Sequence, residues 1–146
     1  MKKIVQTKTL LSTIRIRGFE PHTYGTGKNK DNPKRKKEIR DILKNEIKKI
    51  ESLDDVQKRC KGKKIFMRVR FYLWKDIEIT ERPNKDLDNL LKLLLDAICD
   101  HIDGTKTIPG LGIMVNDREV FQIHADKKLV DREADEGFEI EISEYL

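Results

Sequence analysis

The segment from Leu87 to Ile102 carries leucine and isoleucine along one side. Its apolar residues recur at the three- and four-residue spacings of an α-helix, at positions 87, 90, 91, 94, 95, 98 and 102. A helix with a continuous apolar stripe is stable when that stripe packs against another layer of the same domain. The spacing therefore predicts a helix from about residue 87 with one buried face.

Residues 64–74, KIFMRVRFYLW, alternate with the two-residue period of a β-strand. One side of the predicted strand is wholly apolar, and the other mixes aromatic rings with Arg68 and Arg70. A strand whose second face is partly covered by a helix is the commoner explanation of such a mixture. Contact of that face with nucleic acid is the alternative.

The remaining elements follow from weaker patterns. TIRIRGF from Thr13 alternates as a strand does, and the Gly-, Pro- and Asn-rich residues 20–33 indicate a loop. A helix should begin at Asp31 or Asn32, with Pro33 in its first turn, and should run to about Ser52. Its apolar stripe would consist of Ile39, Leu43, Ile47 and Ile50. Three later segments, GIMVND, VFQIHADKKLV and FEIEISEYL, have β-like composition.

This order of strands and helices predicts an α/β fold. We expect one small domain over residues 1–146, in which a mixed β-sheet packs with two main helices. Charged residues make up 39% of the chain, above the roughly 25% of an average globular domain, so the core should be small. No apolar run approaches the ~20 residues of a membrane span, and no signal segment follows the first methionine. We expect a cytoplasmic protein that has no membrane partner.

Charge is distributed unevenly between the two halves of the chain. Residues 1–75 hold 23 Lys and Arg against 8 Asp and Glu, a balance of +15, whereas residues 76–146 hold 8 against 18, a balance of −10. A basic half is typical of a polyphosphate partner, because neutralised phosphates release condensed counterions. The acidic half would repel that partner unless some of its carboxylates bind metal. Solvated surface on both halves is the alternative explanation.

Two aspartates, Asp86 and Asp88, stand immediately before and within the leucine-faced helix. Inside a helix, residues two apart point about 200° away from each other, so the two side chains converge only if Asp86 lies in extended backbone or at the N-cap. A divalent metal ion between them is one reason for such a pair, and helix capping alone is the other. Lys92 and Asp96 follow at four-residue steps, either as part of the site or as a surface Asp-Lys-Asp ladder.

A metal site needs more oxygen ligands than one pair supplies. In GIMVNDREV, a short apolar strand would deliver Asn116 and Asp117 at its end. If that strand ends beside the start of the helix, Asp117 completes a three-carboxylate cluster for one or two divalent ions. Such ions activate water and neutralise the charge of a phosphodiester.

Two motifs carry a family resemblance. KDLDNLLKLLLDAI resembles the Asp-Leu-Asp-Asn helix motif of the RusA-type Holliday-junction resolvases, and VNDREV resembles their downstream strand motif. GFEIEISEY is similar to the last strand of that family, so the resemblance covers roughly residues 82–145. It implies a small α/β homodimer that uses Mg²⁺ or Mn²⁺ to nick paired strands at four-way DNA junctions.

By this resemblance, Asp86, Asp88 and Asp117 are the metal-binding catalytic carboxylates and Lys92 is the catalytic lysine, supported by Asn89 and Asp96. We therefore expect a metal-dependent, structure-specific endodeoxyribonuclease of DNA recombination and repair. Basic residues from the first helix and its flanks would hold the DNA backbone, namely Lys34, Lys36, Lys37, Arg40, Arg82 and Lys85. A non-catalytic nucleic-acid-binding module, or a nuclease acting on flaps or other branched DNA, are the alternatives.

Overall fold

The computed structural model describes residues 8–21, 32–75, 86–99, 101–103, 106–108, 110–114 and 117–146; within these, the side chains of residues 32, 101–103, 106–108 and 117 are not described. Its helices and strands follow in the order β1 (Lys8–Arg17), α1 (Asn32–Lys48), α2 (Leu53–Cys60), β2 (Ile65–Trp74), α4 (Leu87–Ile98), β3 (His101–Asp103), β4 (Lys106–Ile108), β5 (Val120–Val130) and β6 (Gly137–Glu144). Two short 3₁₀ turns, Asp117–Glu119 and Glu133–Asp135, precede β5 and β6.

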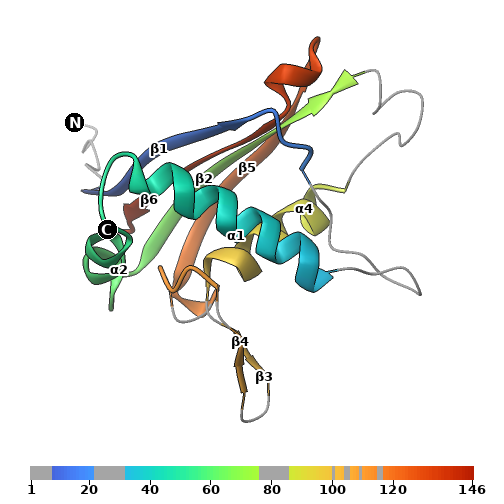
Figure 1. The fold of residues 1–146 in the computed structure, drawn as a ribbon. Helices are drawn as coiled ribbons and strands as arrows, with labels where there is room; N and C mark the ends of the chain where they lie inside the picture. Colours follow the sequence, from blue (N-terminus) through green and yellow to red (C-terminus); the bar gives the residue numbers. More distant parts are fainter. Residues whose placement is uncertain are drawn as a thin grey trace, which may run out of the picture.

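Four strands form the main sheet, in the order β1-β6-β2-β5. β2 and β5 run parallel, whereas β6 pairs antiparallel with both β1 and β2. The sheet is therefore mixed, and the α/β prediction for a small single domain is confirmed. Figure 1 shows α1 and α4 crossing the same face of this sheet, with α2 at the end where β2 begins. β3 and β4 form a separate two-stranded hairpin.

The core lies between this sheet face and the helices. The predicted alternation of β2 is confirmed, because its five inward side chains are buried at Ile65, Met67, Val69, Phe71 and Leu73. The antiparallel register places Ile140 and Phe138 of β6 beside Val69 and Phe71, which extends the apolar surface across the sheet. α1 and α4 cover it with further buried side chains, among them Ile39, Leu43, Ile47, Leu90 and Leu94.

The other face of β2 is not covered as expected. The described helices lie on the opposite side of the sheet. The aromatic and arginine side chains of β2 instead contact side chains of the neighbouring strands. Arg70 forms a two-point ion pair with Asp126 of β5, in which Nε and Nη2 donate to the two carboxylate oxygens at 2.8 and 2.9 Å. This pair joins the edge strand to the sheet centre.

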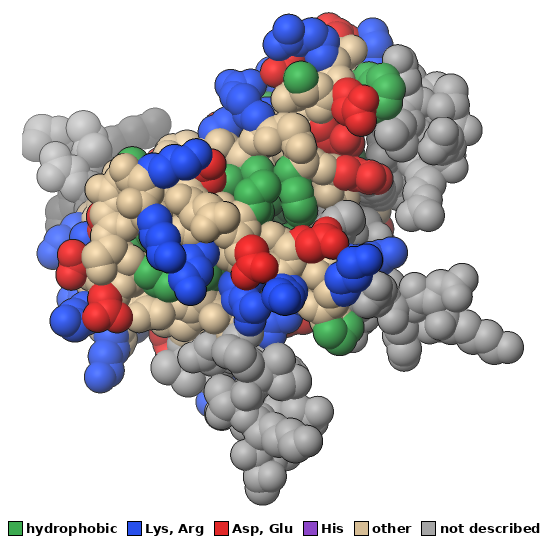
Figure 2. Space-filling model, in the orientation of Figure 1, with side chains coloured by type: hydrophobic (Ala, Val, Ile, Leu, Met, Phe, Trp, Pro, Cys, Tyr) green, Lys and Arg blue, Asp and Glu red, His purple; other side chains and the backbone are tan. Residues whose placement is uncertain are grey.

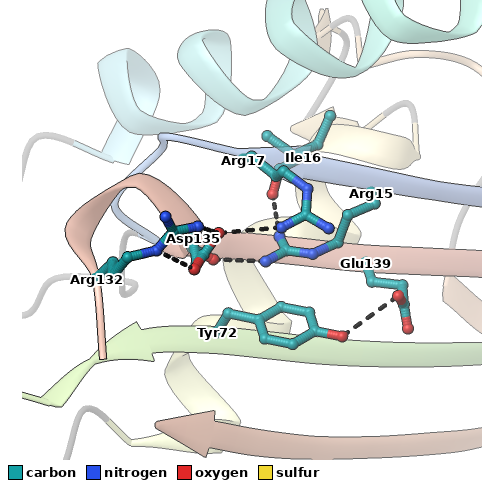
Figure 3. A network of polar contacts seen from close by, with 7 residues as sticks. All are labelled: Arg15, Ile16, Arg17, Tyr72, Arg132, Asp135 and Glu139. Atoms are coloured by element: carbon teal, nitrogen blue, oxygen red, sulfur yellow. Dashed lines mark hydrogen bonds and ion pairs between the residues drawn. The ribbon is translucent and has the colours of Figure 1, made fainter. Parts of the chain in front are cut away.

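A second polar network holds the connection between β5 and β6 against β1 (Figure 3). The Arg15 guanidinium stacks 3.6 Å from the ring centre of Tyr72 and donates to the backbone oxygen of Asp135. The Asp135 carboxylate accepts from Arg132 at 3.0 Å, and the Tyr72 hydroxyl donates to Glu139 at 3.3 Å. Burial lowers the pKa of Arg15, and repulsion from Arg17 lowers it further. The neighbouring acidic groups offset only part of this decrease.

The first helix is shorter than the sequence predicts. α1 ends at Lys48, and Ile50, expected on its buried stripe, is 58% exposed. A separate helix that was not predicted, α2, starts after Ser52 and buries Val56 and Cys60. The domain therefore packs three helices in its described part, instead of two.

The leucine-faced helix is confirmed but ends early. α4 stops at Ile98, and Ile102 lies in β3, so the prediction to residue 102 is wrong at its end. The buried stripe also turns slightly relative to the predicted one, because Leu93 and Ala97 are buried whereas Leu91 and Leu95 lie at its edge. The predicted strand GIMVND is wrong in its described residues, where only a single bridge joins Met114 to Cys99.

Candidate functional site

Asp86 is the N-cap residue of α4. Its backbone is extended, with φ −68° and ψ 125°, and its carboxylate Oδ1 accepts the backbone N–H of Asp88 at 3.1 Å. The carbonyl of Asp86 accepts from the N–H of Leu90 at 3.0 Å, which starts the helix. Asp86 thus takes the extended conformation that convergence of the two carboxylates requires, and both residues sit at one helix start.

The local sequence explains this geometry. Leu90, Leu93 and Leu94 bury one side of α4 completely, which fixes the rotation of the helix about its axis. With that rotation, Asp86 and Asp88 are exposed. The positive end of the helix dipole lies beside them and stabilises negative charge there. Two accessible carboxylates at a helix N-terminus are able to supply oxygen ligands to a hard cation such as Mg²⁺.

The polar residues that follow on α4 lie along the exposed side of the helix. Lys92, one turn after Asp88, is exposed, whereas Asn89 and Asp96 are half-buried. Residues four apart on a helix are surface neighbours, so Lys92 lies next to Asp88, one turn further along the axis. A lysine in this place is able to contact a phosphoryl oxygen of a ligand bound at the helix start.

The helix that carries the predicted basic residues, α1, packs next to α4. α1 and α4 pack together, and in Figure 1 both begin on the same side of the molecule. Lys34 and Lys37 are exposed, and Lys36 and Arg40 are half-buried. Figure 2 shows Lys and Arg side chains next to Asp and Glu side chains on this face. Arg82 and Lys85, also predicted to contact DNA, lie outside the described residues.

Asp117 is placed differently from the other two predicted ligands. Its backbone opens the 3₁₀ turn Asp117–Glu119, and its side chain is not described. Met114 bridges to Cys99 at the C-terminal end of α4, and Val120 pairs with Ile65 at the start of β2. The turn thus lies near the end of α4, and Figure 1 shows it away from the helix start.

The length of α4 gives the scale of this separation, since 12 residues at ~1.5 Å each span about 18 Å. The structure therefore places Asp86 and Asp88 at the same helix start but does not bring the Asp117 backbone to them. Among the described side chains, no group of three His, Cys, Asp or Glu residues is arranged to hold a metal ion. Magnesium takes water and phosphate oxygens as well as carboxylates, so a site with two protein carboxylates would need such ligands to complete it.

Two surface features lie outside the predicted site. A hollow of about 650 Å³ on the uncovered sheet face is lined by residues that include Arg68, His124 and Glu141. The two-residue period of β2 places Arg68 on that face, but nothing local predicts the partners from β5 and β6. The second feature is a stacked pair of exposed rings, Phe121 and Tyr145, which come from separate segments of the chain.

Comparison of the chain with protein-family models, with curated proteins and with solved structures found no match. None of the helices in the described ranges has the length and apolar character needed to cross a membrane.

Proposed function

We propose that this protein is a metal-dependent, structure-specific endodeoxyribonuclease that resolves four-way DNA junctions by paired nicks. The observation that carries the proposal is the N-cap conformation of Asp86, which joins its carboxylate to the backbone of Asp88 at the exposed start of α4. The motif resemblance over residues 82–145 and the basic residues of α1, the helix that packs against α4, give further support.

In this proposal Asp86 and Asp88 hold Mg²⁺ or Mn²⁺, which when bound would supply an activated water for attack on the phosphodiester. Lys92 would offset negative charge on the phosphorane transition state from the next turn of the helix. Lys34, Lys36, Lys37 and Arg40 would hold the DNA backbone by charge, and Asn89 and Asp96 would support the site. Asp117 remains a proposed third ligand, which requires a rearrangement of the turn that it opens.

The substrate also implies a homodimer. A four-way junction presents two equivalent strands, and two coordinated nicks need two active sites related by a two-fold axis. The charge balance of +15 over residues 1–75 suits a partner that exposes many phosphates.

The decisive experiment compares cleavage of a synthetic four-way junction, a flap and a linear duplex, each with and without Mg²⁺. The intact chain should nick the junction in pairs only with metal, and Asp88→Asn should bind the junction but leave it uncut. Asp54→Asn is the matched control, because Asp54 is an exposed aspartate in the first turn of another helix. Cleavage by Asp88→Asn at the wild-type rate would contradict the proposal. Cleavage of flaps in preference to junctions would keep the chemistry but change the substrate.

A second candidate is a nucleic-acid-binding module without catalysis. It is favoured by the same hydrogen bond, because Asp86 already has a structural role as the cap of α4. This module would bind junctions with a steep dependence on salt, would need no divalent metal and would give no product.

A further inference from the structure

We infer that the corner formed by Lys64, Phe121 and Tyr145 binds unpaired nucleotides, through base stacking on the two rings and phosphate contact to the lysine. We call these three residues the aromatic corner. The inference shares with the proposed function the assumption of a nucleic-acid partner, but it does not depend on cleavage.

The two rings of the aromatic corner form a built surface. Phe121 and Tyr145 stack with their centroids 5.7 Å apart and their planes inclined by 30°. Lys64 Nζ lies 5.2 Å from the centroid of Phe121. The N–H of Tyr145 donates to the carbonyl of Lys64 at 2.7 Å, so the backbone after β6 is joined to the backbone before β2. Three separate segments therefore hold one aromatic platform in place.

The platform is exposed because of an irregularity in β5. Val120 pairs with Ile65, but the next pair joins Gln122 to Phe66, so Phe121 is the extra residue of a β-bulge. A bulge re-aims the side chain of its extra residue, and here Phe121 is 54% exposed. Tyr145 is 39% exposed. Two large rings held together in water are suited to a flat apolar ligand such as a nucleobase.

The charge of the neighbouring segment favours an anionic ligand. The stretch from Val56 to Lys64 contains Lys58, Arg59, Lys61, Lys63 and Lys64, with no acidic residue among them. Two of these cations have acidic partners, since Arg59 pairs with Glu51 at 2.6 Å and Lys63 lies 3.8 Å from Glu144. Lys64 is exposed beside the Phe121 ring, and Lys61 is exposed in the turn that precedes β2. Stacking rings bordered by lysines are typical of surfaces that bind single strands.

The same charge disfavours a second copy of this chain as the occupant. In a two-fold contact each patch meets the identical patch, which would bring lysines against lysines. A polyanion instead gains from every lysine that it meets. The aromatic corner is also separate from the carboxylate pair, because it lies where β2 begins, whereas Asp86 lies at the start of α4, which Figure 1 shows away from that end of β2.

The test is fluorescence anisotropy of a fluorescein-labelled oligothymidine, titrated with the full-length chain in the absence of divalent metal. Phe121→Ala and Tyr145→Ala should each weaken binding about 5- to 100-fold, the usual effect of losing one base-stacking ring. Leu129→Ala is the matched control, because Leu129 is an apolar side chain of the same strand with 51% exposure, and it should bind as the wild type does. Lys64→Gln should reduce the salt dependence of binding, whereas Lys128→Gln, further along β5, should not.

A direct contact is measured by photocrosslinking of bromodeoxyuridine-substituted oligonucleotide, with the adduct mapped by mass spectrometry. We expect the adduct on Tyr145 or Phe121. Wild-type affinity in both ring variants, or conversion of a wild-type dimer to a monomer by Phe121→Ala, would overturn the inference. If the wild type binds no oligonucleotide or junction at all, the proposed function fails as well. If both ring variants bind the oligonucleotide as the wild type does, while Asp88→Asn loses junction cleavage, the inference fails and the proposed function stands.

Discussion

The carboxylate of Asp86 accepts the backbone N–H of Asp88 at 3.1 Å, so one side chain proposed as a metal ligand also caps the helix that carries the other. Capping uses Oδ1 of Asp86. The position of Asp86 relative to Asp88 is therefore set by the way the helix begins. The two roles of Asp86 have different chemical requirements. Capping needs a short side chain with a hydrogen-bond acceptor, whereas binding Mg²⁺ depends on the negative charge.

Substitution of Asp86 separates these roles. Asn is as good an N-cap as Asp, so the free energy of unfolding of Asp86→Asn should lie within about 0.5 kcal/mol of the wild-type value. That of Asp86→Ala should be lower by about 1 kcal/mol. Both variants should lose junction cleavage, because neither provides the carboxylate. Urea unfolding measures the effect on stability, and the junction assay on the same samples measures the effect on cleavage. Wild-type cleavage by Asp86→Asn would show that the residue acts as a cap only.

Asp117 is tested by the corresponding amide. If the 3₁₀ turn brings Asp117 to the pair when DNA is bound, Asp117→Asn should abolish cleavage as completely as Asp88→Asn, because Mg²⁺ would lose one of three carboxylates. The stability of this variant should be unchanged. Cleavage at the wild-type level in Mg²⁺ would exclude Asp117 as a required ligand, in agreement with the separation seen along α4.

The elements that sequence patterns predicted best are those with long, regular periods. β2 alternates over 10 residues, interrupted only at Phe66, which is also buried, and α4 buries its leucine stripe over 12. α2 was missed because its 8 residues give only about two turns, in which Val56 and Cys60 are the buried side chains. Ile50 was wrongly assigned to the core because helical spacing continues past Lys48, whereas the backbone does not.

The candidate site also contains residues whose positions local sequence predicts and residues whose positions it does not. The position of Asp86 follows from local sequence, because the leucine period fixes where α4 begins and Asp is favoured immediately before it. The position of Asp117 depends on the parallel pairing of β5 with β2, and no local pattern specifies that pairing. The contact of Phe121 with Tyr145 likewise joins distant segments through a bulge, which the alternation of β5 does not reveal.

Gly137 is the residue whose substitution should damage the sheet most directly. Its φ is +154°, and a Cβ at this position would lie 2.0 Å from the carbonyl oxygen of Ile16 on β1. Gly137→Ala should therefore lower the free energy of unfolding by more than about 3 kcal/mol, since backbone must shift to admit the methyl group.

Gly62 is the control for this change. It also has a positive φ, +72°, but a Cβ there would meet nothing within 4 Å. Gly62→Ala should cost only about 1–2 kcal/mol, the strain of a left-handed alanine. Equal losses in the two variants, measured by urea denaturation, would contradict the close approach of Gly137 to Ile16.

Cys60 should make stability depend on alkaline pH. Burial raises the pKa of its thiol from 9.0 to about 11, and the nearby Arg59 offsets only part of this effect. Above pH 9 the unfolded chain loses the thiol proton while the folded chain keeps it, so this contribution to stability is complete below pH 9 and is lost as the pH rises to 11. The free energy of unfolding of the wild type should fall by about 2 kcal/mol more than that of Cys60→Ala over this interval. Parallel curves for the two proteins, from urea denaturation at stepped pH values, would show that the thiol is not buried in the folded state.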